Sequence, residues 1–211
     1  RGALGGEDII DTVLELPRVA EYIVEKMWRA LVSDTPDAGE VRRLARVFRS
    51  ADYEIKPLMR ALLNSDAFRD PAHRGVLIKS PVQLIVGTMR VFGVEVERPH
   101  RILRLCAQLG QSVFDPPNVK GWPGGTAWIT SGTLLMRQQL LARLFRDPGN
   151  IPDLSRDGWR ALHGAKTRPD PAALAMKTLL PMAPVFPLDA VSSDPFDVAR
   201  HAVLDPAYQL T

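Results

Sequence analysis

The residues best suited to binding or chemistry lie in one loop, FDPPNVKGWPGGTAWITSG, which spans residues 114–132. Its prolines fix backbone angles and its glycines reach angles that other residues avoid, so the loop can hold a single shape. Such a loop could bind an anion or a carboxylate through Lys120, the glycine backbone and the free N–H groups of a helix that begins near Ser131. It could instead stack the exposed faces of Trp122 and Trp128 on a sugar or on a partner.

A purely structural role for this loop is the alternative. The two tryptophans would then fill the gap between helices, Asn118 would tie the loop backbone, and Lys120 would be solvated. Tight packing of aromatic, proline and glycine residues explains the composition without a ligand. A phosphate-binding loop of the Gly-x-x-x-x-Gly-Lys-Ser/Thr type is missing. We expect Trp128, next to the helix start, to lie in the core and Trp122, between a glycine and a proline, to be the more exposed.

A second candidate surface is rich in arginine. The stretch RPHRILR places three arginines at i+3 spacing near one helix face: Arg98, Arg101 and Arg104. This spacing predicts a basic patch that could bind an anion, and an ordinary solvated face is the alternative.

The usual catalytic and metal-binding motifs are missing. The four histidines are isolated, with no His-Glu-x-x-His pattern and no second ligand at i+4, so we predict no metal site and no cofactor. A Gly-x-Ser-x-Gly nucleophile turn is also missing. The single cysteine, Cys106, lies on an apolar helix face and is expected to be a buried thiol rather than a nucleophile.

Apolar residues recur at helical spacing along most of the chain, so the elements that carry these residues are predicted to be helices and the fold all-α. The expected helices occupy residues 7–16, 17–33, 38–51, 54–68, 80–94, 99–110 and 131–147, with short helices at 155–163, 170–180 and 194–204. The sequence thus predicts an irregular multi-helix protein with a Pro/Gly/Trp-rich loop before a long helix. We expect a main helical domain at residues 1–147 and a proline-rich, short-helix extension at 148–211 that packs on the same core.

Composition narrows the function only slightly. The chain has 211 residues, 45% hydrophobic and 24% charged, which is typical of a globular protein. A net charge of +3 is too small to indicate specific nucleic-acid binding. No run reaches the roughly 18 apolar residues of a transmembrane helix, and the chain carries no signal-peptide pattern.

The block PNVKGWPGGTAWITSGTLLMR resembles the hallmark loop and helix of a bacterial family, domain of unknown function 1800 (DUF1800). Further blocks resemble that family in the same order: DIIDTVLELPRVAEYIVEKMWRALVSDTP, IKPLMRALLNSDAF, IKSPVQLIVGTMRVFG and HAVLDPAYQL. Members usually carry a further N-terminal half, so the chain resembles a C-terminal portion. The resemblance implies a mostly helical protein that is exported to the periplasm or beyond, and whose gene often neighbours one for a sulfatase-like protein. It implies no catalytic residue.

These observations lead to two expectations about function. The first is a helical binding or accessory module of a larger exported protein. Its partner would be its own N-terminal half or another protein chain, such as the neighbouring sulfatase-like protein. Apolar residues of the helices at 7–32 would supply an interface. The alternative is the C-terminal part of a hydrolase-like enzyme whose catalytic residues lie mainly in a separate N-terminal half.

Overall fold

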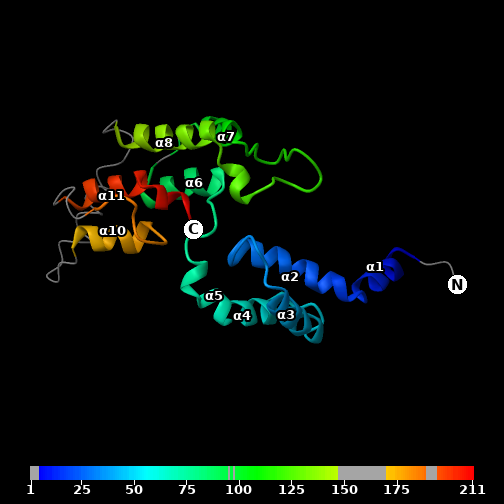
Figure 1. Cartoon of the computed structure of the whole chain (residues 1–211). Helices are drawn as coiled ribbons and strands as arrows, with labels where there is room; N and C mark the ends of the chain where they lie inside the picture. The colour runs from blue at the N-terminus through cyan, green and yellow to red at the C-terminus, as the bar shows by residue number, and fades with distance from the viewer. Residues whose placement is uncertain (1–4, 95, 97, 147–169, 189–193) are drawn as a thin grey trace. The chain divides into compact units, whose positions relative to one another are not determined.

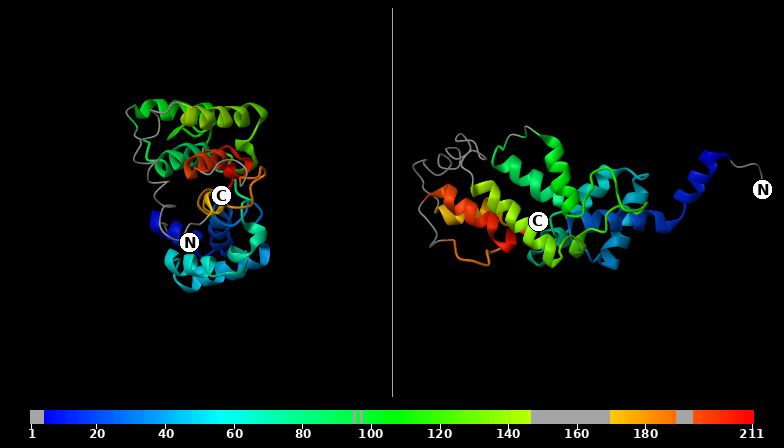
Figure 2. Two further views of the ribbon diagram at one scale, coloured as in Figure 1. Left: turned by 90° about the vertical axis from the view of Figure 1, so that its left-hand side faces the viewer. Right: turned by 90° about the horizontal axis from the view of Figure 1, so that it is seen from above.

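The computed structural model describes residues 5–94, 96, 98–146, 170–188 and 194–211 as helices joined by loops. No strand forms within these ranges, and the predicted all-α, irregular multi-helix fold is confirmed. The chain divides into two compact units, residues 1–76 and residues 77–211. Figures 1 and 2 show the helices of each unit.

The first unit is built from helices that pack along one apolar stripe each. Its elements are α1 (Gly6–Leu14), α2 (Pro17–Leu31), α3 (Ala38–Ser50), α4 (Ile55–Leu63), α5 (Asp66–Arg69) and η1 (Pro71–His73). Helix α3 packs against both α2 and α4, and Trp28, Leu44 and Leu58 are fully buried between them. The Trp28 indole N–H donates to Ser33 Oγ at 3.0 Å, so the ring is buried with its polar atom satisfied.

Helix α1 differs from its neighbours because none of its described side chains is buried. In Figure 1 it continues outward from the start of α2. Its C-terminal end is held by backbone contacts: the Tyr53 hydroxyl donates to the Leu14 carbonyl, and Arg49 donates to the Glu15 carbonyl at 3.3 Å. The exposed apolar side chains of α1 and of the residues that follow it are here called the α1 apolar face, which consists of Ile9, Ile10, Val13 and Leu16.

The second unit packs its helices around a cluster of aromatic rings. Its elements are α6 (Pro81–Val91), α7 (Pro99–Gln108), η2 (Gly125–Trp128), α8 (Ser131–Arg146), α10 (Pro171–Leu179), α11 (Pro195–Leu204) and η4 (Pro206–Gln209). Helix α11 contacts both α8 and α10 and lies between them in Figure 1. Phe92 packs edge-on against Phe145 and Phe196, with ring centroids 4.9 and 6.2 Å apart. These rings form part of one core to which α6, α8, α10 and α11 all contribute.

The end of the chain pairs with the segment that precedes α6. Lys79 N–H donates to the Gln209 carbonyl, and Thr211 N–H donates to the Leu77 carbonyl, both at 2.8 Å. An antiparallel bridge between Ile78 and Leu210 lies within this pairing. The pairing brings the Lys79 carbonyl and the Gln209 side chain to Arg137 of α8.

The short helices predicted at 170–180 and 194–204 are confirmed as α10 and α11. The helix predicted at 155–163 lies outside the described residues. The predicted division between residues 147 and 148 also falls at the edge of an undescribed range, and it stays a prediction.

Candidate functional site

The loop between α7 and α8 is held at its C-terminal end by Trp128. This side chain is only 6% exposed, so the expectation that it belongs to the core is confirmed. Its ring lies against Gly110, where an added Cβ would come within 3.9 Å of the indole. Gly110 itself has φ +96°, a backbone angle that favours glycine. Gly110, where the loop leaves α7, therefore packs against Trp128, where the loop returns to the core.

Trp122 is half-buried, which confirms that it is the more exposed of the two loop tryptophans. Its indole nitrogen is nevertheless buried and has no hydrogen-bond partner among the described residues. A buried donor without a partner costs about 1–3 kcal/mol. The side chain of Trp122 therefore contributes less to the stability of the fold than that of Trp128.

The structure does not join Lys120 to the start of α8. Asn118 and Lys120 are both exposed, and the Lys120 backbone N–H donates to Asn118 Oδ1 at 2.9 Å. The cap of α8 is Thr130, whose Oγ1 accepts from the Thr133 N–H at 3.1 Å, while Ser131 is the first, exposed residue of the helix. Within the described loop, no hydrogen bond or ion pair brings Lys120 to this helix end. The anion site predicted there stays a prediction.

The loop instead presents an apolar tip that the sequence analysis did not single out. Phe114 is 95% exposed and has φ +65°, and Val119 is fully exposed. Pro116 and Pro117 lie between them and stiffen the backbone. We call Phe114 and Val119 the loop tip. The only sequence signal was an aromatic residue placed outside any helical stripe and next to a Pro-Pro pair.

The predicted basic patch lies on α7 and at its N-cap. Arg98, Arg101 and Arg104 are all exposed, in keeping with either an anion-binding surface or a solvated face. Cys106 on the same helix is buried, as expected, and burial raises the pKa of its thiol.

A buried polar cluster forms where α8 meets the paired chain end. Arg137 is 0% exposed, and its Nη1 donates to the Lys79 carbonyl at 3.0 Å and to Gln209 Oε1 at 3.3 Å. Lys79 Nζ donates to the Tyr208 carbonyl at 2.7 Å and lies 3.8 Å above the Tyr208 ring centroid. Burial lowers the pKa of Lys79 to about 8 and also lowers the pKa of Arg137. A fully buried arginine and a half-buried lysine thus belong to one cluster of the second unit.

Sequence reasoning missed this cluster, although one signal for it was present. Arg137 stands four residues before Leu141 and eight before Phe145, which are the other two buried residues of α8. A charged residue in the register of a buried helical stripe is unusual unless it has a specific partner. Lys79 and Gln209 could not have been found in the same way because they meet only through long-range pairing.

Asp205 is a buried carboxylate with a structural role. It accepts the backbone N–H groups of Val185, Phe186 and Ala207 at 3.1, 2.9 and 2.8 Å. These bonds connect the end of α11 to the loop after α10. Because its oxygens are already used by backbone donors, Asp205 accounts for the fold rather than for chemistry.

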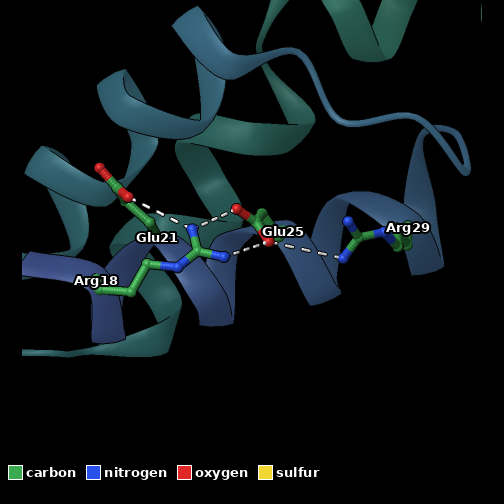
Figure 3. Close-up of polar contacts among 4 residues, drawn as sticks. All are labelled: Arg18, Glu21, Glu25 and Arg29. Atoms are coloured by element: carbon green, nitrogen blue, oxygen red, sulfur yellow. Dashed lines mark hydrogen bonds and ion pairs between the residues drawn. The ribbon is translucent and has the colours of Figure 1, made fainter.

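In the first unit, charged side chains form a network along α2, shown in Figure 3. Both terminal nitrogens of Arg18 donate to the Glu25 carboxylate, at 2.5 and 3.0 Å, and Arg18 Nη1 also lies 3.5 Å from the Glu21 carboxylate. Arg29 lies 3.8 Å from the same Glu25 carboxylate. The hydrogen bonds from Arg18 hold the pKa of Glu25 below its usual value. This network lines a cavity of about 270 Å³ beside α3, and its balanced charges are typical of a helix surface.

The described histidines have local structural contacts. His73 Nδ1 lies 2.7 Å from the Ala67 carbonyl, and its ring packs edge-on against Trp28. His201 Nδ1 lies 2.9 Å from the Asp197 carbonyl within α11, and His100 is exposed. His163 lies outside the described residues. In the ranges that the structure describes, no group of three or more His, Cys, Asp or Glu side chains is placed to hold a metal ion.

The helical units and the Trp-Pro-Gly-Gly loop define a class of all-α protein with a rigid interhelical loop. None of the described helices is both long and apolar enough to cross a membrane. The family model described as "Protein of unknown function (DUF1800)" matches residues 1–204, and the chain belongs to that family. Comparisons with curated proteins and with solved structures gave no match.

Proposed function

We propose that the protein is a helical docking module that binds a partner protein through the loop tip. Phe114 carries this proposal, because its ring is 95% exposed while its backbone has φ +65°. A non-glycine residue in the left-handed region costs about 1–3 kcal/mol, and such strain is concentrated at functional sites. Phe114 is the third residue of a turn that is closed by a hydrogen bond of 3.1 Å from the Asp115 N–H to the Ser112 carbonyl. That position usually carries glycine or asparagine, and the exposed Phe114 ring offsets none of the cost through the core.

The remainder of the loop supports a docking role because it is stiff and anchored. Two prolines lie between Phe114 and Val119, and Trp128 fixes the far end of the loop in the core. A surface that is already ordered loses little conformational entropy on binding. Exposed aromatic residues on such surfaces are common among the side chains that contribute most to protein–protein affinity. We therefore expect the partner to offer an apolar pocket for the Phe114 ring.

The family resemblance adds context to this proposal. It favours an accessory role in a larger exported protein, with a partner that is either another part of the same polypeptide or the sulfatase-like protein of the neighbouring gene. Cell fractionation of the source bacterium tests the export. The C-terminal part of a hydrolase-like enzyme stays the alternative, and in that case the loop tip is expected to contact the catalytic part of the same chain.

Photo-crosslinking in cells that produce the full-length protein tests the docking role. A photoreactive phenylalanine analogue replaces Phe114, and the matched control carries it at Leu103, an exposed apolar residue of α7 in the same unit. We expect crosslinks to a second protein from position 114 and none above background from position 103. Crosslinks from position 114 confined to the same chain would favour the enzyme alternative.

Binding of the purified partner then measures the contribution of the loop tip. Loss of a buried aromatic anchor typically weakens binding by about tenfold or more. We expect Phe114→Ser to show such a loss with an unchanged melting temperature, and Leu103→Ser to bind like the wild type. Equal affinities for the Phe114→Ser variant and the wild type would refute the proposal.

A further inference from the structure

Arg137 presents a donor edge that nothing in the described part of the chain occupies. Its Nη1 is anchored by the Lys79 carbonyl and Gln209 Oε1. Its Nε and Nη2 are buried and have no hydrogen-bond partner. These two nitrogens share one edge of the planar guanidinium group and carry parallel N–H bonds. Arginine commonly binds a carboxylate through two parallel hydrogen bonds donated from this edge.

A third unsatisfied donor belongs to Gln209, the residue whose side-chain oxygen accepts from Arg137 Nη1. The Gln209 side chain uses its oxygen to accept from Arg137, and its amide nitrogen is buried without a partner among the described residues. Exchanging the two ends of the amide would place a donor against the arginine, so the observed orientation is the favourable one. The cluster therefore combines three buried donor nitrogens without a partner in the described part of the chain, two on Arg137 and one on Gln209.

The local charge is also unbalanced. Neither Arg137 nor Lys79 forms a salt bridge with a described residue. The buried carboxylate of Asp205 is occupied by three backbone N–H groups. A guanidinium cannot neutralise itself by losing its proton. Burying such a charge is tolerated when an anion or a full set of acceptors compensates it.

We propose that the free edge of Arg137, together with the Gln209 amide, binds the carboxylate group of a small carboxylic acid. The two oxygens of a carboxylate match the two parallel N–H groups, and the Gln209 amide can donate to one of them. Lys79 adds a second positive charge that favours an anion over a neutral ligand. Because the edge is shielded from solvent in this structure, the ligand enters through local opening and exchanges slowly.

Formate is the probe, because it is the smallest carboxylate and has a neutral analogue of similar size, formamide. The full-length protein is labelled with 15N-arginine, and formate or formamide is added at constant ionic strength set with sodium chloride. We expect a saturable change in the Arg137 Nε–H resonance with formate and none with formamide. No saturable change, or an equal response to formamide, would show that water alone satisfies the edge and would overturn the proposal.

Two variants locate the binding at this cluster. Arg137→Lys keeps a charge but loses the parallel donors, so affinity for formate is expected to fall by about tenfold or more. Gln209→Glu supplies a carboxylate inside the cluster and is expected to abolish formate binding while the protein stays folded. The matched control, Gln139→Glu on the exposed side of α8, is expected to bind formate like the wild type. Formate binding that survives in Gln209→Glu would place the ligand elsewhere and refute the assignment, even if Arg137→Lys failed to fold.

Discussion

The two loop tryptophans provide the sharpest test of how the loop is held. Trp128→Ala removes a side chain that is 94% shielded from solvent, since its exposed fraction is 6%. A buried tryptophan removes about 150–250 Å² from water, which at about 25 cal/mol per Å² corresponds to an upper bound of about 4–6 kcal/mol. We expect the free energy of unfolding to fall by about 3–5 kcal/mol, as for other large aromatic truncations in cores.

Trp122 should behave differently because its ring is half-buried and its indole nitrogen lacks a partner. The gain from burying Trp122 is smaller than the gain from burying Trp128, and the unsatisfied donor offsets about 1–3 kcal/mol of it. Trp122→Ala is therefore expected to lower the free energy of unfolding by only about 0–2 kcal/mol. Trp122→Phe keeps most of the apolar contact and removes the N–H group. This variant is expected to be as stable as the wild type or up to about 1 kcal/mol more stable.

Urea unfolding followed by far-ultraviolet circular dichroism measures these differences. Because the chain has two compact units, hydrogen exchange of the α8 amides is followed in parallel as a measure specific to the second unit. Losses of equal size from the two alanine variants would refute the reasoning. So would a change below about 0.5 kcal/mol for Trp128→Ala, because surface substitutions have effects of that size.

Three further predictions concern other parts of the molecule. The folded-state pKa of Lys79 is about 8, whereas the ordinary pKa of a lysine is 10.5, so between these pH values the unfolded chain holds a proton that the folded chain has lost. The stability of the wild type relative to Lys79→Met is therefore expected to rise from pH 8 to pH 10.5, by about 1–3 kcal/mol after allowance for solvent screening. Urea titrations at several pH values measure this difference in stability. A difference that does not change with pH would contradict the prediction. Asp205→Ala leaves three backbone N–H groups without their acceptor and is expected to lower the free energy of unfolding by about 3 kcal/mol in the urea assay. The control Asp115→Ala, at an exposed position, should change it by less than about 0.5 kcal/mol. The α1 apolar face is expected to drive self-association of the 211-residue chain, and the double variant Ile10→Ser, Val13→Ser should weaken this association. Sedimentation equilibrium measures it. A wild-type protein that stays monomeric at high concentration would argue against this interface.

The sequence predicted most of the described helices because they carry local signals. The single helix expected at 54–68 was wrong, because α4 ends at Leu63 and Ser65 caps a separate short helix, α5. Asp37 and Ser80 accept the N–H groups of Glu40 and Gln83 as helix caps, and both residue types favour that position. The different burial of Trp122 and Trp128 was also predictable, because one lies beside a helix start and the other between residues that favour turns.

The buried cluster was not predictable because its members are far apart in the sequence. Arg137 meets Lys79 and Gln209 only after the chain end pairs with the segment before α6. Hydrophobic periodicity identifies the stripe of a helix, but it does not identify which distant backbone carbonyl will accept a buried guanidinium. The orientation of Phe114 was beyond reach for a related reason, since a left-handed backbone is the usual preference of glycine or asparagine rather than phenylalanine.

Helix α8 physically connects the loop to the buried cluster. Thr133, Arg137, Leu141 and Phe145 follow one another at four-residue steps and so lie along one face of the helix. At the start of this face, the Thr133 hydroxyl donates to the Trp128 carbonyl at 3.0 Å and so fixes the loop anchor. One turn later Arg137 holds the paired chain end, and the two following turns enter the core. A shift of α8 along its axis would therefore disturb the Trp128 anchor and the Arg137 contacts together.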